Sequence, residues 1–104
     1  MARDDYFFDG VDEAVIRRER QKARDLRKSR WWQNKLAACT CYYCQGHFKP
    51  AQLTMDHLQP LARGGTSSKG NLVCACKECN SKKKNLLPYE WEEYMTRMQE
   101  DKKD

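Results

Sequence analysis

Long apolar runs are absent from this sequence. No stretch approaches the ~20 consecutive apolar residues that a membrane-spanning helix needs. The first ten residues are acidic and lack the apolar core of a signal peptide. We therefore expect an intracellular, cytoplasmic protein without a membrane partner.

Apolar residues are also few overall. They make up 39% of the 104 residues, against 34% charged residues, and the mean hydropathy is −1.02. So short a chain buries only a modest fraction of its surface, so we expect one domain held together by an additional link such as a metal ion. No internal repeat or low-complexity tract is present.

The charge is distributed unevenly along the chain, whose net charge is +5. Residues 17–35 hold nine basic and two acidic side chains and residues 36–88 hold seven and two, whereas residues 1–16 and 89–104 are net acidic. A polyanion would be drawn to the basic middle, because counterions released from nucleic acid favour binding. A solvated basic face without a partner would have the same composition.

Glycine and proline are missing between residues 11 and 36, which predicts one long basic helix capped by Asp9. Short strands are predicted over residues 53–58 and 72–74, on either side of a loop rich in glycine and serine. Two more helices are predicted, over residues 77–85 and from Pro88 to about residue 100. We assign the three tryptophans to the core, with stacking on unpaired bases as the alternative; they are Trp31, Trp32 and Trp91.

The cysteines are spaced like metal ligands. Cys41 and Cys44 form one Cys-x2-Cys pair, and Cys76 and Cys79 form a second pair after 31 intervening residues. In a reducing compartment two such pairs predict one structural zinc ion bound by four thiolates, rather than disulfides. A redox motif would need a βαβ context, which the predicted elements do not provide.

Two further cysteines leave the ligand set open. Cys39 and Cys74 each precede a cysteine of a pair by two residues and would point the same way in an extended segment. They are either buried thiols near the metal or members of an alternative quartet. His47, three residues after Cys44, is either a replacement ligand or an exposed turn residue, and we prefer the second interpretation.

Polar residues recur at fixed spacing between and after the cysteine pairs. Asp56 and His57 end the first predicted strand, Asn71 comes fourteen residues after His57, and Asn80 nine residues after Asn71. Together with the cysteine pairs, this pattern over about residues 38–87 resembles the HNH endonuclease family, in the branch that has a four-cysteine zinc site. The resemblance implies an α+β fold, the small zinc-stapled ββα-metal domain, in which two short strands flank a large loop and a helix packs across them.

The resemblance also implies a role for each polar residue. His57 is the general base, Asp56 and Asn80 hold one catalytic divalent cation (Mg²⁺ or Mn²⁺), and Asn71 fixes the imidazole. A neutral histidine, with a pKa of about 6.5, can take a proton from water at neutral pH, and hard cations prefer oxygen ligands. Lys84 stands where some family members have a histidine ligand, so only two protein ligands are expected. The implied products carry a 5′ phosphate and a 3′ hydroxyl.

Neighbouring residues such as Asp56 and His57 point to opposite faces of a regular strand. We therefore expect this pair at the end of the strand, where the chain can leave the ladder. Gly64 and Gly65 should let the following loop bring Asn71 back toward His57.

We expect three parts: a basic helical arm (1–37), an HNH-like nuclease core with the four-cysteine zinc site (38–87) and a C-terminal helix that packs on the core (88–104). We expect phosphate contacts from basic residues of the arm, the loop and the helix after the second cysteine pair. These are Arg17, Arg18, Arg24, Arg27, Arg63, Lys82, Lys83 and Lys84.

The sequence thus predicts a metal-dependent endonuclease that acts on double-stranded DNA as a monomer and nicks one strand per encounter. The alternative is a non-catalytic, zinc-ribbon-like DNA-binding module. It explains the cysteines and the charge equally well, but not the spacing of His57 and its polar partners. A protein-interaction adaptor that uses the acidic C-terminal helix is a third interpretation.

Overall fold

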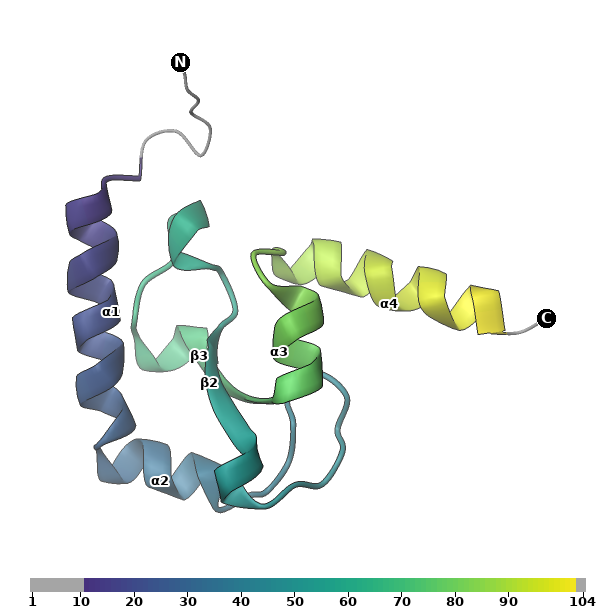
Figure 1. The fold of residues 1–104 in the computed structure, drawn as a ribbon, viewed down its shortest axis with the longest axis horizontal. Helices are drawn as coiled ribbons and strands as arrows, with labels where there is room; N and C mark the ends of the chain where they lie inside the picture. The colour runs from purple at the N-terminus through teal and green to yellow at the C-terminus, as the bar shows by residue number, and fades with distance from the viewer. Residues whose placement is uncertain (1–10, 103–104) are drawn as a thin grey trace.

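The computed structural model describes residues 11–102 (Figure 1). A two-stranded sheet lies among four helices, which confirms the predicted α+β class. The elements are α1 (Glu13–Arg27), α2 (Arg30–Leu36), β2 (Leu53–His57), β3 (Leu72–Cys76), α3 (Lys77–Lys83) and α4 (Pro88–Lys102). Single 3-10 turns interrupt the connections, at Pro50–Gln52, Leu61–Arg63 and Lys69–Asn71.

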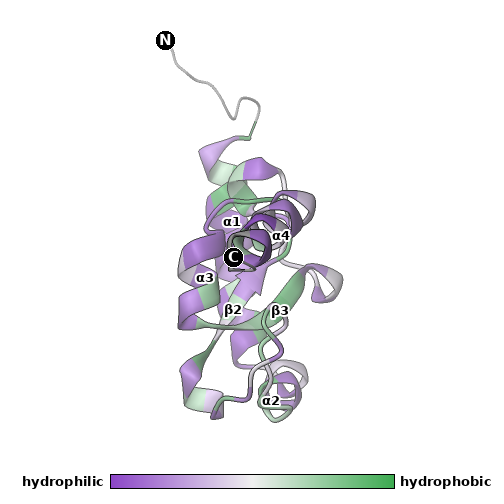
Figure 2. Cartoon of the chain, turned by 90° about the vertical axis from the view of Figure 1, so that its right-hand side faces the viewer, coloured by the Kyte–Doolittle hydropathy of each residue, from purple (hydrophilic) through white to green (hydrophobic). Residues whose placement is uncertain are grey.

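The two strands form an antiparallel hairpin around a long loop. Leu53 pairs with Cys76 at one end and His57 pairs with Leu72 at the other. One further hydrogen bond, from the Leu58 amide to the Asn71 carbonyl (2.9 Å), continues the ladder beyond His57. All five residues of β3 are buried, and Figure 2 shows this strand as hydrophobic. Both predicted strands are confirmed, with ends within two residues of those expected.

The prediction of a single N-terminal helix is wrong, because the chain forms two helices, α1 and α2, with a break at Ser29. The Ser29 hydroxyl donates to the Leu26 carbonyl (2.6 Å) and accepts from the Trp32 amide (3.2 Å), so it caps α2. Serine competes for backbone groups in this way and is favoured at helix starts. Asp12 caps α1, through a bond from the Ala14 amide (2.9 Å). The predicted cap Asp9 lies outside the described residues.

The helices surround the hairpin on different sides. In Figure 1, α1 runs alongside it on the opposite side from α3. Figure 2 shows α1 as largely hydrophilic, and its buried residues are Glu19 and Ala23. In the described part of the chain, no helix combines the length and the apolar character that crossing a bilayer requires.

The core lies between β3, α2 and the start of α4. Trp32 and Trp91 are buried in one cluster with cysteines and Leu53, and Trp31 packs against it. The Trp91 ring packs edge-on against the Tyr43 ring, with the two ring centroids 5.3 Å apart. This contact attaches the first turns of α4 to the cysteine-rich segment. The predicted core position of the tryptophans is confirmed. The rest of α4 extends away from the hairpin (Figure 1).

Candidate active site and metal centre

Four cysteines from distant parts of the chain meet at one end of the hairpin. The sulfur atoms of Cys41, Cys44, Cys76 and Cys79 all lie within 4.8 Å of one another. Sulfurs about 2.3 Å from a tetrahedral zinc ion would be about 3.8 Å apart, so the cluster is close to ligand geometry. Burial raises the pKa of the Cys79 thiol, whereas a bound cation favours the thiolate. The donor set therefore fits Zn²⁺.

The turn that carries the first cysteine pair depends on a glycine. The Gly46 carbonyl accepts from the Cys41 amide (3.0 Å), and the Gly46 amide donates to Cys44 Sγ (3.4 Å). A Cβ atom at Gly46 would lie 3.0 Å from the Phe48 ring and 3.3 Å from Cys44 Sγ. In the second pair the Cys79 amide donates to Cys76 Sγ (3.5 Å). Such bonds to sulfur orient the ligands before a metal binds.

Cys39, Cys74 and His47 lie outside this four-sulfur cluster. Cys74 is a buried residue of β3, where burial raises the pKa of its thiol. Cys39 adopts a positive φ of 55° just before the first pair. His47 is exposed and forms an isolated β-bridge with Thr40. The geometry thus favours the quartet of the two Cys-x2-Cys pairs.

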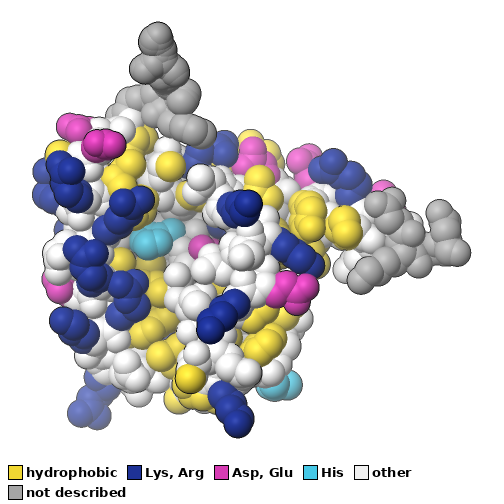
Figure 3. All heavy atoms as spheres, in the orientation of Figure 1, with side chains coloured by type: hydrophobic (Ala, Val, Ile, Leu, Met, Phe, Trp, Pro, Cys, Tyr) yellow, Lys and Arg dark blue, Asp and Glu magenta, His cyan; other side chains and the backbone are white. Residues whose placement is uncertain are grey.

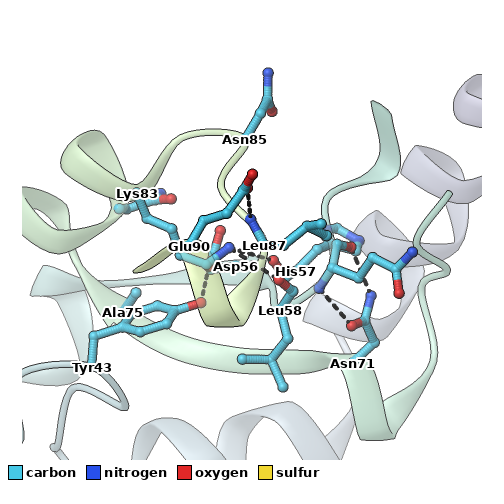
Figure 4. Close-up of polar contacts among 12 residues, drawn as sticks. Tyr43, Asp56, His57, Leu58, Asn71, Ala75, Lys83, Asn85, Leu87 and Glu90 are labelled. Atoms are coloured by element: carbon cyan, nitrogen blue, oxygen red, sulfur yellow. Dashed lines mark hydrogen bonds and ion pairs between the residues drawn. The ribbon is translucent and has the colours of Figure 1, made fainter. Parts of the chain in front are cut away.

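Asp56 is buried against α3 and the cysteine-rich turn. Its Oδ2 accepts from the Tyr43 hydroxyl and lies 3.6 Å from Lys83 Nζ (Figure 4). Burial and the hydrogen bond to Asp56 raise the pKa of Tyr43, so its hydroxyl keeps its proton. Among the described residues no donor bonds Oδ1 of Asp56, so this oxygen has no hydrogen-bond partner there.

His57 faces the other side of β2, toward the loop and α1. Its Nε2 lies 3.0 Å from the Ser67 hydroxyl. Burial lowers the pKa of His57, and the nearby carboxylates of Asp56 and Glu19 oppose that shift. The imidazole therefore remains a neutral proton acceptor at neutral pH.

The two neighbours nevertheless line one surface pocket. It has a volume of about 270 Å³ and lies at the end of β2. The expected departure from the ladder at this pair is wrong, because Asp56 and His57 both pair regularly with β3. Side chains from α1, the loop and the residues after α3 complete it: Ile16, Arg20, Pro60, Leu61, Ala62, Lys84 and Asn85. An arginine and a lysine thus meet a carboxylate and an imidazole, which suits a phosphate group and the water that attacks it.

Asn80 lies on α3 and is oriented by Thr54 of β2. The Thr54 hydroxyl donates to the Ala75 carbonyl (3.0 Å), so toward Asn80 Nδ2 (3.1 Å) it can only accept. The Asn80 Oδ1 then points away from Thr54 and has no hydrogen-bond donor among residues 11–102. Thr54 and Asp56 alternate onto the same face of β2. The structure thus places Asn80 on the Asp56 side of the strand, although Asn80 does not line the pocket.

Asn71 bonds to the loop backbone rather than to the imidazole. Its Oδ1 accepts from the Gln59 amide (2.9 Å), and its Nδ2 donates to the Gln59 (3.1 Å) and Thr66 (2.8 Å) carbonyls. Two segments of the loop pack closely there. A Cβ atom added at Gly65 would lie only 1.8 Å from the backbone oxygen of Gln59. Asn71 thereby holds the segment that presents Ser67, the partner of the imidazole.

The basic residues predicted to contact phosphate differ in their surroundings. Lys83 is fully buried and donates to the His57 (3.2 Å) and Leu58 (3.1 Å) carbonyls, so it cannot reach a surface ligand here. Arg63 pairs with Glu90 of α4 (3.2 Å). Lys82 pairs with Glu78 (3.0 Å) on the exposed side of α3. Lys84 is exposed and lines the pocket.

The arginines of α1 form a charged surface beside the pocket. Figure 3 shows Lys and Arg side chains gathered over α1, next to a hollow in which a histidine is exposed. At 100° per residue, Arg20 and Arg27 lie on one side of the helix and Arg18 on another. Arg20 lines the pocket, and Arg27 approaches Met55 of β2 (3.9 Å from Nη1 to Sδ).

The sequence pattern did not select Arg20, which lines the pocket, or Tyr43, Thr54 and Ser67, which contact the predicted site residues. Arg20 could have been selected, because it lies four residues after Ile16 on the stripe that faces the hairpin. Tyr43 lies between the two cysteines of the first pair, where an aromatic residue is usually interpreted as a packing residue. No sequence signal singles out Thr54 or Ser67, because a hydroxyl residue in a strand or loop is ordinary.

Comparison with known proteins gives a family match over the central segment. Residues 41–86 match the sequence model of the HNH endonuclease family. This segment contains both cysteine pairs and all four polar residues of the predicted site. The match therefore confirms the resemblance to this family.

Two curated relatives are also similar to this segment. One is the CRISPR-associated endonuclease Cas9 of Corynebacterium diphtheriae, which is 40% identical over 48 residues, or 45% of this chain and 4% of the relative. The other is the CRISPR-associated endonuclease Cas9 of Actinomyces naeslundii, 36% identical over 52 residues, or 49% of this chain and 5% of the relative. The matches thus span about a twentieth of the length of these relatives.

Proposed function

We propose that this chain is a metal-dependent endonuclease that hydrolyses phosphodiester bonds in DNA. The observation that carries the proposal is the pocket at the end of β2, where His57 and Asp56 meet Arg20 and Lys84. The match to the HNH endonuclease family and the endonuclease names of the two relatives support a nuclease domain. The catalytic roles, the metal ion and the DNA substrate are our proposals.

In the proposed mechanism His57 is the general base. It takes a proton from a water molecule, whose oxygen then bonds to phosphorus on the side opposite the departing 3′ oxygen. The bond from phosphorus to that oxygen breaks, and the departing oxygen takes a proton from solvent. The products carry a 5′ phosphate and a 3′ hydroxyl. Arg20 and Lys84 lie where they can offset negative charge on the phosphate.

The oxygen atoms left free on Asp56 and Asn80 would hold one divalent cation. Both are hard donors, and two protein ligands leave other positions for water and phosphate, which fits Mg²⁺ or Mn²⁺. When bound, such an ion would polarise the scissile phosphate and stabilise charge on the departing oxygen. Asn71 would act on His57 through the loop.

The arginines on the pocket side of α1 would bind the DNA backbone. Arg20→Ala and Arg27→Ala should weaken DNA binding and reduce its salt dependence, because each removes a phosphate contact. Arg18→Ala is the matched control: Arg18 was among the predicted phosphate contacts, but it lies on another side of the same helix, so we now expect no contact from it. Equal effects of all three substitutions would contradict this orientation of α1 on the duplex.

The proposed function is tested on supercoiled plasmid DNA with Mg²⁺ or Mn²⁺. One site per chain should nick one strand per encounter as a monomer, so relaxed circles should precede linear DNA. His57→Ala should abolish cutting while DNA binding remains, and His47→Ala should cut normally. DNA binding without cutting by the unaltered protein would reject the nuclease and favour the non-catalytic zinc-ribbon-like module. Linear DNA without earlier relaxed circles would reject nicking.

A further inference from the structure

We propose that Glu19 and Ser67 are positioning residues for the general base, so that α1 forms part of the active site. This proposal rests on the proposed function and extends it. It starts from a chain of hydrogen bonds that runs from α1 through the loop to His57. Neither Glu19 nor Ser67 was among the residues that the sequence pattern selected.

The Ser67 hydroxyl determines which nitrogen of His57 carries the proton. Its single proton is donated to the Glu19 carbonyl (2.5 Å), which can only accept. Toward His57 Nε2, at 3.0 Å, the hydroxyl must therefore be the acceptor. The neutral imidazole is protonated at Nε2, and its Nδ1 has a free lone pair. Among the described residues nothing hydrogen-bonds to Nδ1, so this atom is the one available to take a proton from water.

Glu19 fixes Ser67 through a second contact. Its Oε1 accepts from the Ser67 amide (2.6 Å), while Oε2 accepts from Lys22 Nζ (3.1 Å) on the same helix. Glu19 and Ser67 are only 9% and 7% exposed, so the two hydrogen bonds between them are shielded from water. A carboxylate buried on a largely hydrophilic helix needs such partners. These two contacts hold the serine in one orientation, and the serine holds the ring.

The linkage gives α1 a role beyond its positive charge. The residues that match the HNH family begin at residue 41, whereas Glu19 lies on a helix outside that segment. Without α1, Ser67 would lose its contacts with Glu19 and would no longer be held against Nε2 of His57. A variant that loses the anchor should therefore bind DNA and metal normally but turn over slowly.

Turnover kinetics provide the first test. Ser67→Ala should lower kcat by roughly 10- to 100-fold with little change in KM for DNA, because only the orientation of the base is lost. Ser67→Thr keeps the hydroxyl and should restore most of the activity. Ser68→Ala, at the exposed neighbouring position, is the matched control. If Ser67→Ala cut DNA at the rate of the unaltered protein, the proposal would be overturned.

A double-mutant cycle tests the connection to α1. Glu19→Ala should also lower kcat, and the Glu19→Ala, Ser67→Ala double variant should be no slower than Ser67→Ala alone, because Glu19 acts on His57 only through the Ser67 hydroxyl. Glu19→Gln keeps an oxygen acceptor for the Ser67 amide and should retain more activity than Glu19→Ala. Multiplied losses in the double variant would show that Glu19 does not act through Ser67.

Nitrogen NMR of the imidazole supplies a readout that does not require activity. The chain has two histidines, so the His57 signals are those lost in His57→Ala. At about pH 8.5, well above the usual histidine pKa, the unaltered protein should show protonation at Nε2 alone. Ser67→Ala should shift the signals toward a mixture of the two tautomers, and Ser68→Ala should not. Unchanged His57 signals in Ser67→Ala would overturn the proposal. If the unaltered protein cuts no DNA, the proposed function fails, while the NMR comparison still decides the role of Ser67.

Discussion

Replacing Lys83 with methionine is expected to destabilise the fold strongly. The Lys83 side chain is fully buried, and its ammonium group donates to the His57 and Leu58 carbonyls at 3.2 and 3.1 Å. It also lies 3.6 Å from the buried Asp56 carboxylate and 5.6 Å from the centre of the Tyr43 ring. Methionine has a similar length but no donor. The substitution would leave a buried carboxylate and two carbonyls without their cation.

The expected cost follows from that loss of partners. Burial lowers the pKa of Lys83, but the neighbouring Asp56 carboxylate opposes this shift and favours the charged amine. Removing one partner of a buried ion pair costs about 3–5 kcal/mol, because the other charge stays buried and uncompensated. In a domain of this size, such a loss lowers the melting temperature by roughly 12 °C or more.

Thermal unfolding with zinc present measures this effect. Lys82→Met is the control, because the neighbouring Lys82–Glu78 pair has side chains 48% and 74% exposed and should contribute at most about 1 kcal/mol. Mn²⁺ should raise the melting temperature of Lys83→Met more than that of the unaltered protein, since a cation at Asp56 replaces the missing charge. Equal melting temperatures of Lys83→Met and Lys82→Met would refute the reasoning.

Three further predictions concern the metals and the anchoring carboxylate. Cys79→Ser, or removal of zinc by a chelator, should abolish cooperative unfolding followed by near-ultraviolet circular dichroism, because zinc binding contributes about 10 kcal/mol or more to such folds; an unchanged transition would argue against a structural ion. Thr54→Val should weaken Mn²⁺ binding by about 10-fold or more in calorimetric titrations, because Asn80 loses its orienting acceptor, whereas Thr54→Ser should bind normally. If Thr54→Val bound as tightly, the amide would not be oriented by the hydroxyl. The Ser67 amide and Lys22 lower the pKa of Glu19, so its carboxylate stabilises the fold above its usual pKa, and this stabilisation is lost as the pH falls through the lowered value. The stability difference between the unaltered protein and Glu19→Gln in urea unfolding should therefore shrink below about pH 4; a constant difference would contradict the assignment.

The fold could be predicted largely because its sequence signals are local. Two Cys-x2-Cys pairs, a glycine-rich loop between two apolar runs, and Pro88 at a helix start each indicate their structure without long-range information. The break at Ser29 could not be predicted with the same ease, because a serine inside a helix-forming stretch is tolerated as often as it caps. Burial of Trp32 against the core selects the capped form.

The site could be predicted as a set of residues but not as a set of contacts. Spacing selected His57 and Asp56, and the structure brings both to one pocket. The partners that orient them depend on how the loop and α1 fold back over the strand, which no local pattern records. Lys83 illustrates the limit, since three consecutive lysines look alike in the sequence, yet the middle one is buried.

The predicted zinc site and Asp56, the proposed cation ligand, are connected through Tyr43. This residue lies between Cys41 and Cys44, and its hydroxyl donates to Asp56. In the proposed site, a zinc-bound turn would therefore hold one oxygen of Asp56 and leave the other for the divalent cation. His57 takes its orientation from the opposite side, from Ser67 and α1. Loss of zinc should thus act first on the cation site, while loss of the α1 anchor should act first on the base.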